Sequence, residues 1–287
     1  MGMRTLLFSV VIALAPACDK GSADAKGDAK STADAKTADG KIDGKTDAKT
    51  DVAKPAAGLP EATAVLDKAV EAVGGKAKVE SIQSFYVEGQ LAVSGQNITG
   101  EMKLWWKGGD FYTEQTMIGI GTIKGGKQGD TIWSQDPING LRKLAGTEAE
   151  QYSWGSSLLL AADWQRYFAT AETVGERELG GKKVYDVKLT SKSGANVQLT
   201  FDATNGLQVA QEFKGSTPLG EMPIAVKLQD YREVDGLKLP YEQVTDAKLA
   251  EATQKITKIE LNGAIDATKF AMPSGGAEVV EPPAVGP

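Results

Sequence analysis

The sequence contains no histidine and only one cysteine among its 287 residues. The lack of histidine excludes Ser-His-Asp and Cys-His catalysis, and zinc sites built on imidazole nitrogens. A single cysteine excludes a disulfide within the chain and leaves no second thiol for a metal site. Chemistry by carboxylate, lysine or tyrosine side chains, an oxygen-ligated metal, or no chemistry at all remain open.

Basic residues are fewer than acidic residues in this chain. The chain has 32 Lys and Arg against 38 Asp and Glu, which gives a net charge of −6. Arg4 is the only charged residue before residue 19, and residues 19–55 carry eight Asp and eight Lys, so residues 56–287 carry −7. An acidic domain of this kind is repelled by a phosphate backbone, and nucleic-acid binding is not expected.

The hydrophobic run near the N-terminus is short. Residues 6–14 are apolar but for one serine, too few for a helix that crosses a bilayer, which needs about 20 residues. They follow Arg4 and precede Ala17 and the lone Cys18, an order typical of a bacterial lipoprotein signal peptide. We therefore predict that residues 1–17 are a signal peptide and that Cys18 carries a lipid anchor. An ordinary secretory signal and an uncleaved anchor are the alternatives.

Low-complexity sequence follows the cysteine. Residues 19–55 repeat the triplet Asp-Ala-Lys and contain no aromatic residue. Such a stretch cannot bury enough apolar surface to offset the entropy of ordering it, so we predict that residues 18–55 form a disordered tether. The expected location is the bacterial cell envelope, with the protein lipid-anchored and facing the periplasm. Asp19 leaves the choice between the inner and the outer membrane open.

Residues 56–273 are predicted to form one folded domain, followed by a disordered tail, residues 274–287. The domain opens with a helix after Pro60, whose apolar residues recur at helical spacing up to Gly74 and Gly75. The strands that alternating patterns and turn residues predict are 85–93, 97–107, 110–118, 121–127, 131–134, 184–190, 196–202, 207–214, 224–233, 239–246 and 254–262. Without βαβ alternation, they predict a mainly β fold with α (α+β), a large curled antiparallel sheet forming a half-barrel. The N-terminal helix and a second helical segment would cover its concave face.

The second helical segment is the most apolar part of the chain after the leader. It opens with a sequence typical of a capping box, Thr147 to Glu150, and Gly155 with two serines divides it into two pieces. The candidate lid or cavity residues for a hydrophobic ligand are Trp154, Leu158, Leu159, Trp164 and Phe168, together with Trp105 of a predicted strand. Trp105 and Trp106 are adjacent in that strand and therefore point to opposite faces. The alternative role of the segment is ordinary core that fills the half-barrel.

Three stretches of turn and strand-edge sequence carry a family resemblance. They are AVGG at 72–75 with SIQSFYVEG at 81–89, FDATNGL at 201–207, and YREVDGLKLP at 231–240 with FAMP at 270–273. Together they resemble the LolA/LolB-like superfamily of periplasmic lipoprotein carriers and outer-membrane lipoprotein acceptors, and related outer-membrane lipoprotein-sorting proteins. None is a catalytic signature, so the resemblance concerns the fold more than an activity.

The resemblance implies a half-barrel with helices as a lid over an apolar cavity that shields acyl chains from water. We therefore predict an envelope lipoprotein that binds lipid or lipidated protein there, in lipoprotein sorting or lipid transfer. Its expected partners are a membrane through Cys18, a hydrophobic ligand (an acyl chain or a lipoprotein) and an envelope protein. The alternative is a non-catalytic structural or interaction lipoprotein with a filled core, acting in an envelope complex. No enzyme activity, cofactor or metal site is predicted.

Overall fold

The computed structural model describes residues 58–217, 220–248 and 250–274. The predicted signal peptide of residues 1–17 and the tether of residues 18–55 with its Cys18 lie outside the described residues, as does the tail beyond residue 274. Those assignments stay predictions. No helix in the described part of the chain is long and apolar enough to cross a membrane.

Two helices precede the sheet, α1 (Ala62–Val73) and α2 (Lys76–Glu80). The residues that α1 buries are Ala62, Val65, Leu66, Ala69, Val70 and Val73, and they lie at the spacing that the sequence predicts. α1 ends at Gly74, whose φ of 134° suits glycine. A Cβ at Gly74 would lie 2.5 Å from the carbonyl oxygen of Gly236, so the end of the helix packs tightly against that turn.

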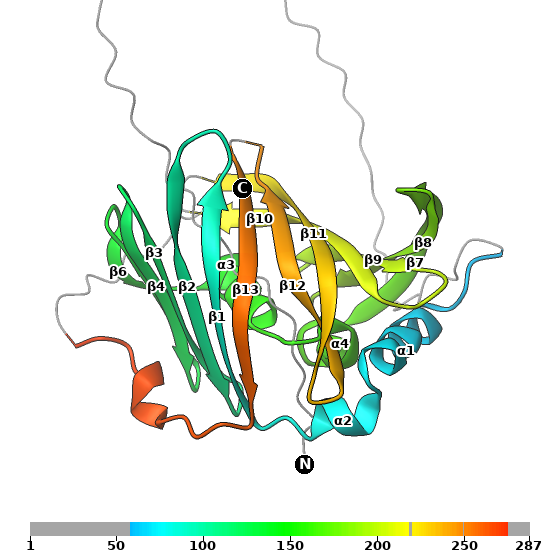
Figure 1. The fold of residues 1–287 in the computed structure, drawn as a ribbon, viewed down its shortest axis with the longest axis horizontal. Coiled ribbons are helices and arrows are strands. Elements are labelled where there is room, and N and C mark those ends of the chain that lie inside the picture. The colour runs from blue at the N-terminus through cyan, green and yellow to red at the C-terminus, as the bar shows by residue number, and fades with distance from the viewer. Residues whose placement is uncertain (1–57, 218–219, 249, 275–287) are drawn as a thin grey trace, which may run out of the picture. The chain divides into compact units, whose positions relative to one another are not determined.

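The strands of the described residues form one antiparallel, 13-stranded sheet. In chain order they are β1 (Ser84–Val93), β2 (Ile98–Lys107), β3 (Asp110–Met117), β4 (Gly121–Gln128), β5 (Thr131–Asp136), β6 (Gly140–Lys143), β7 (Thr170–Leu179), β8 (Lys182–Thr190), β9 (Asn196–Asp202), β10 (Gln208–Thr217), β11 (Gly220–Val234), β12 (Leu237–Asp246) and β13 (Glu251–Leu261). Their spatial order is β6-β5-β4-β3-β2-β1-β13-β12-β11-β10-β9-β8-β7, so the first and last strands pair in the middle. The sheet curls without closing, which confirms the predicted half-barrel (Figure 1).

Two strands, β6 and β7, are missing from the sequence prediction, and they are the two edges of the sheet. β6 is only four residues long. β7 buries only Thr173 of its ten residues, so it has no apolar alternation for a sequence pattern to detect. An edge strand pairs on one side only, and its polar surface is normal for that position.

The chain crosses between these two edges through α3 (Gly146–Gly155) and α4 (Leu160–Tyr167), which lie between β6 and β7. We call residues 146–168 the helical connection. α3 contacts β5 and β10, whereas α1 contacts α4, β7, β8 and β12. In Figure 1 these helices lie within the curve of the sheet. The concave face is therefore covered by the N-terminal helix and the second helical segment, as predicted.

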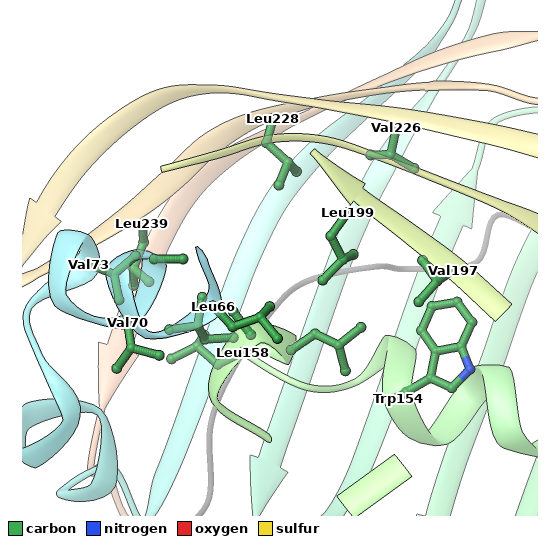
Figure 2. Packing of buried hydrophobic residues seen from close by; sticks show 14 of the residues in the cluster. Leu66, Val70, Val73, Trp154, Leu158, Val197, Leu199, Val226, Leu228 and Leu239 are labelled. Carbon is green, nitrogen blue, oxygen red and sulfur yellow. The ribbon is translucent and has the colours of Figure 1, made fainter. Parts of the chain in front are cut away.

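A continuous hydrophobic core joins the helices to the sheet. The residues labelled in Figure 2 come from α1 (Leu66, Val70, Val73), the helical connection (Trp154, Leu158) and the strands β9, β11 and β12 (Val197, Leu199, Val226, Leu228, Leu239). Each fully buried aliphatic side chain of this kind stabilises the fold by roughly 1.5–3 kcal/mol. The helical connection is held on the concave face mainly by such side-chain contacts.

A second aromatic cluster lies on the convex face. Its buried residues are Tyr112, Trp133, Leu141, Ile265 and Phe270, with Trp105 and Met272 packed against them. The short 3-10 helix η1 (Ala267–Phe270) contacts β3 and β4 over this cluster. Trp133 Nε1 donates to the carbonyl oxygen of Phe270 at 3.4 Å, and Lys269 Nζ lies 3.8 Å from the centre of the Trp105 ring. The C-terminal segment thus covers part of the outside of the half-barrel.

Candidate functional site

The helical connection collects five of the six candidate ligand-contacting residues on the concave face. Trp154, Leu158, Leu159 and Phe168 are each 5% exposed or less and belong to one core. Trp164 is half-buried and packs against the same core. The predicted division of the segment near Gly155 is also present, because α3 ends there and α4 begins at residue 160.

Trp105, the sixth candidate, does not lie with the other five. Its neighbour Trp106 faces the concave core, where it stacks on Phe85 with 5.2 Å between ring centroids. Trp105 packs against the convex cluster instead, between Tyr86 and Tyr112. A ligand held under the helices would therefore not meet Trp105.

Trp154 is the aromatic centre of the helical connection. Its ring meets Phe213 of β10 edge to face, with centroids 5.0 Å apart, and lies 6.0 Å from Phe168. The side chain is buried, and its Nε1 has no hydrogen-bond partner among the described residues. A buried donor without a partner costs roughly 1–3 kcal/mol, so the indole N–H of Trp154 does not stabilise the closed packing of the helical connection.

Hydrogen bonds dock one side of α3 on the sheet. Gln151 Nε2 donates to the carbonyl oxygen of Lys214 at 2.5 Å, and Gln151 Oε1 accepts from the backbone N–H of Ser216 at 2.8 Å. The Gln151 side chain is 3% exposed. Because both bonds go to the backbone of β10, this amide fixes the position of α3 at the end of that strand.

The other side of α3 packs on a glycine of β4. A Cβ at Gly125 would lie 2.8 Å from Cε1 of Tyr152, so only glycine lets the helix approach this closely. Burial, helped by the negative charge of Glu148, raises the pKa of Tyr152 to about 12, and the phenol stays neutral at pH 7. Glu148 is in turn held by Arg142 through two hydrogen bonds of 2.5 and 2.6 Å.

The predicted capping box at Thr147 and Glu150 is wrong. α3 begins one residue earlier, at Gly146, and no side chain caps its N-terminus. Glu150 Oε2 instead accepts hydrogen bonds from the hydroxyls of Ser191 and Ser193, at 2.9 and 2.7 Å. The carboxylate therefore connects α3 to the turn between β8 and β9, a contact that local sequence spacing does not reveal.

A pocket of about 400 Å³ lies where the helical connection meets β4, β5 and the β8–β9 turn. This volume falls in the range of small-molecule sites, roughly 300–1,000 Å³. The residues that line the pocket are Gly109, Lys127, Ile132, Ala149, Glu150, Ser153, Trp154, Gln165, Arg166, Tyr167, Phe168 and Lys192. Trp154 and Phe168 are buried, whereas Arg166 and Lys192 are exposed. The pocket is therefore aromatic on its inner side and cationic at its rim.

Three cationic residues, Lys127, Arg166 and Lys192, line the pocket, and the first two lie next to Gly109. Lys127 Nζ donates to the Gly109 carbonyl oxygen at 3.2 Å and lies 3.7 Å from the carboxylate of Asp110. A Cβ on Gly109 would lie 2.7 Å from Arg166 Nη2, so the guanidinium occupies space that only glycine leaves open. Sequence reasoning missed Lys127, Arg166 and Lys192 because they come from β4, α4 and the β8–β9 turn, which only the fold brings together.

The pocket has the composition of a binding site. Its one lining carboxylate, Glu150, is engaged by the two serine hydroxyls. Within the described ranges, no group of three His, Cys, Asp or Glu side chains is placed to hold a metal ion. The arrangement suits a molecule with an apolar part and a polar end.

Comparison with known proteins identifies the fold. No family model matches the sequence, and a search of curated proteins gives no match. A DUF1329 family protein from Desulfovibrio piger ATCC 29098 is similar in structure, with a TM-score of 0.52 and 13% identity over 74% of this chain and 98% of its own. A LolA superfamily protein from Nitrosomonas europaea has a TM-score of 0.51 and 14% identity, with the same two coverages. The fold is LolA/LolB-like, as the sequence resemblance implied.

Proposed function

We propose that this protein is a lipid-anchored protein of the bacterial envelope that binds an acyl chain of a lipid or a lipidated protein. The chain would lie between the helical connection and the concave face of the sheet. The protein acts without catalysis or cofactor, as a carrier or acceptor in lipoprotein sorting or lipid transfer. The leader and Cys18 support the membrane anchor and a position facing the periplasm.

The observation that carries the binding proposal is the pocket beside Trp154 and Phe168. Its inner wall includes two of the six candidate ligand contacts, Trp154 and Phe168, and its volume of about 400 Å³ suits a small apolar ligand. The helical connection joins both edges of the sheet and is not itself a strand. Its movement away from the sheet to admit a longer chain would break the two hydrogen bonds of Gln151 to β10 but no pair of strands.

One observation favours the second candidate function, an interaction lipoprotein with a filled core. Side chains of α1 and of the helical connection already pack in a continuous cluster with those of β9, β11 and β12 (Figure 2). If that packing is permanent, the half-barrel presents its outer surface and edges to an envelope protein and holds no lipid.

Photo-crosslinking separates these two functions. The full chain, made by cell-free synthesis without membranes, is mixed with a palmitate analogue that carries a diazirine near the end of its chain, irradiated and digested. Acyl binding predicts saturable labelling of peptides from residues 146–168. A permanently filled core predicts no saturable labelling there.

A matched pair of variants tests the position of the ligand. Ala149→Trp places an indole in the pocket and should abolish the labelling, because Ala149 lines the pocket. Ala64→Trp makes the same change at an exposed position of α1 and should leave the labelling unchanged. Equal labelling of both variants would show that the ligand binds elsewhere.

A further inference from the structure

We infer that the pocket beside Trp154 selects an amphiphile with one acyl chain and an anionic end. The carboxylate or phosphate would lie among Lys127, Arg166 and Lys192, and the chain would run inward along Trp154 and Phe168. This names the ligand class for the proposed site and rests on the proposed function. The shared chemistry is an anion at the end of a chain, as in a free fatty acid or a lysophosphatidic acid.

The charge of the pocket is opposite to that of the domain. Residues 56–287 carry a net charge of −7, yet the pocket gathers three cations around one lining carboxylate. Glu150 accepts hydrogen bonds from two serine hydroxyls, and Asp110 lies 3.7 Å from Lys127 and accepts a hydrogen bond from the backbone N–H of Gly129. Among the described residues, Arg166 and Lys192 form no ion pair. The positive charge at the rim is therefore available to an anionic group.

The backbone at Gly109 is adapted to this cluster. Gly109 has a φ of 97° and is buried, so it places no side chain in the space that the Arg166 guanidinium occupies, while its carbonyl oxygen accepts a hydrogen bond from Lys127 Nζ. A guanidinium donates two parallel hydrogen bonds to a carboxylate or phosphate, and an ammonium adds a mobile point charge. Two cationic donors of different geometry beside the same glycine suit an anion better than a neutral carbonyl or hydroxyl.

The polarity of the pocket changes in one direction, which sets the orientation of the ligand. Its exposed residues are Gln165, Arg166 and Lys192, whereas Trp154 and Phe168 are 2% and 4% exposed. An acyl chain directed inward removes its apolar surface from water, and the anionic end stays at the rim, where it remains partly hydrated. The reverse orientation would bury the charge against aromatic rings.

Chain-matched fluorescent probes test this inference. The full chain, made by cell-free synthesis, is titrated with cis-parinaric acid and with its methyl ester, which differ in charge but not in chain. The acid should bind roughly ten-fold more tightly than the ester, since hydrogen bonds to charged groups are stronger than those to neutral ones. The double variant R166Q/K192Q should bind the acid about as weakly as it binds the ester and so lose this preference. The matched control K214Q/K238Q, which removes two exposed lysines outside the pocket, should bind as the parent does.

Each outcome has a distinct meaning. Equal binding of acid and ester overturns the inference and leaves the proposed function intact. No saturable binding of either probe means that the proposed function itself fails. Displacement of bound parinaric acid by palmitate or by lysophosphatidic acid supports the inference and identifies which anionic source is preferred. Displacement by acetate or inorganic phosphate at equal concentrations overturns it, because the chain would then contribute nothing.

Discussion

Trp133 of β5 packs against the backbone of Gly126 on the neighbouring strand β4. The two residues are register partners, and a Cβ at Gly126 would lie 2.6 Å from the indole atoms Cε2 and Cζ2. Trp133 is fully buried in the convex cluster, where its ring lies 6.0 Å from that of Tyr112. The glycine therefore lets the aromatic row of β1, β2 and β3 continue across β4 to β5.

Gly126→Ala should destabilise the domain through this contact. Overpacking a tight site of this kind costs roughly 1–3 kcal/mol, because the indole must leave its rotamer or the strands must separate. Urea unfolding followed by tryptophan fluorescence measures the loss. Gly263→Ala is the control, since a Cβ at Gly263 meets nothing within 4 Å. Equal unfolding midpoints for the two variants would contradict the tight contact.

Arg177→Met should destabilise the β7 edge of the sheet. Arg177 Nε donates to Asp186 at 2.7 Å, and the Asp186 side chain is 8% exposed, so removing the cation leaves a nearly buried carboxylate without its charge partner. We expect a loss of about 2 kcal/mol, less than for a fully buried pair because Arg177 is 38% exposed. Adding Asp186→Asn should recover part of this loss.

The control for this pair lies on the surface. Lys214 and Glu221 are 3.7 Å apart and 78% and 61% exposed, and Lys214→Gln should change the free energy of unfolding by less than about 0.5 kcal/mol. Chemical denaturation of the three variants at low salt gives the comparison. A loss at Lys214 as large as that at Arg177 would show that burial of the acid is not the cause.

Asp202 should make stability depend on pH in the acid range. Burial alone would raise its pKa, but the N–H groups of Thr204 and Asn205, at 2.8 and 3.2 Å, and the charge of Lys182 lower the pKa below its usual value. A group with a lowered pKa stabilises the folded state above the pKa of the unfolded chain, about 3.9 for Asp. That contribution disappears as the pH falls through the folded pKa.

The Asp202→Asn variant checks the sign of this effect. The difference in unfolding free energy between the parent and Asp202→Asn should be largest at neutral pH and should shrink on acidification below about pH 4. Asp67→Asn, at an exposed position of α1, gives the effect of the same substitution on the surface. If the difference in unfolding free energy stays constant from pH 7 to pH 3, the stabilisation comes from the packing and hydrogen bonds of the Asp202 side chain and not from its negative charge.

Gln151→Ala should loosen the helical connection without unfolding the sheet. It removes both hydrogen bonds between α3 and the backbone of β10. We expect residues 146–168 to exchange amide hydrogens faster than β1 and β13 in the parent protein, and faster still in the variant. Hydrogen exchange measured by mass spectrometry gives both rates. Protection of this segment equal to that of the central strands would exclude a mobile cover.

Much of the architecture is predictable because its local patterns agree with the fold. α1 follows from apolar residues at helical spacing and a glycine end, and most strands follow from alternation. The same alternation places Trp105 and Trp106 on opposite faces, which the structure confirms. It does not decide which of them faces inward, because the cover of the convex face comes from residues 265–272, far away in the sequence.

The remaining features depend on contacts between distant segments. The sequence around Glu150 is typical of a helix-capping residue, but in the structure its carboxylate accepts hydrogen bonds from the hydroxyls of Ser191 and Ser193 instead. The cations Lys127 and Arg166 become neighbours only after the helical connection packs beside β4. Local sequence carries no sign of either arrangement, since no periodicity relates residues on separate elements.

The pairing of β1 with β13 is expected to form after the hairpins of the sheet. Every other neighbouring pair in the sheet is a hairpin of consecutive strands, whereas Phe85 pairs with Leu261 across nearly the whole domain. Closing a loop of that length comes after the local hairpins, because its entropic cost is the largest and long-range contacts form slowly. During synthesis, β1 therefore has only β2 as a neighbour until the last strand of the domain has left the ribosome.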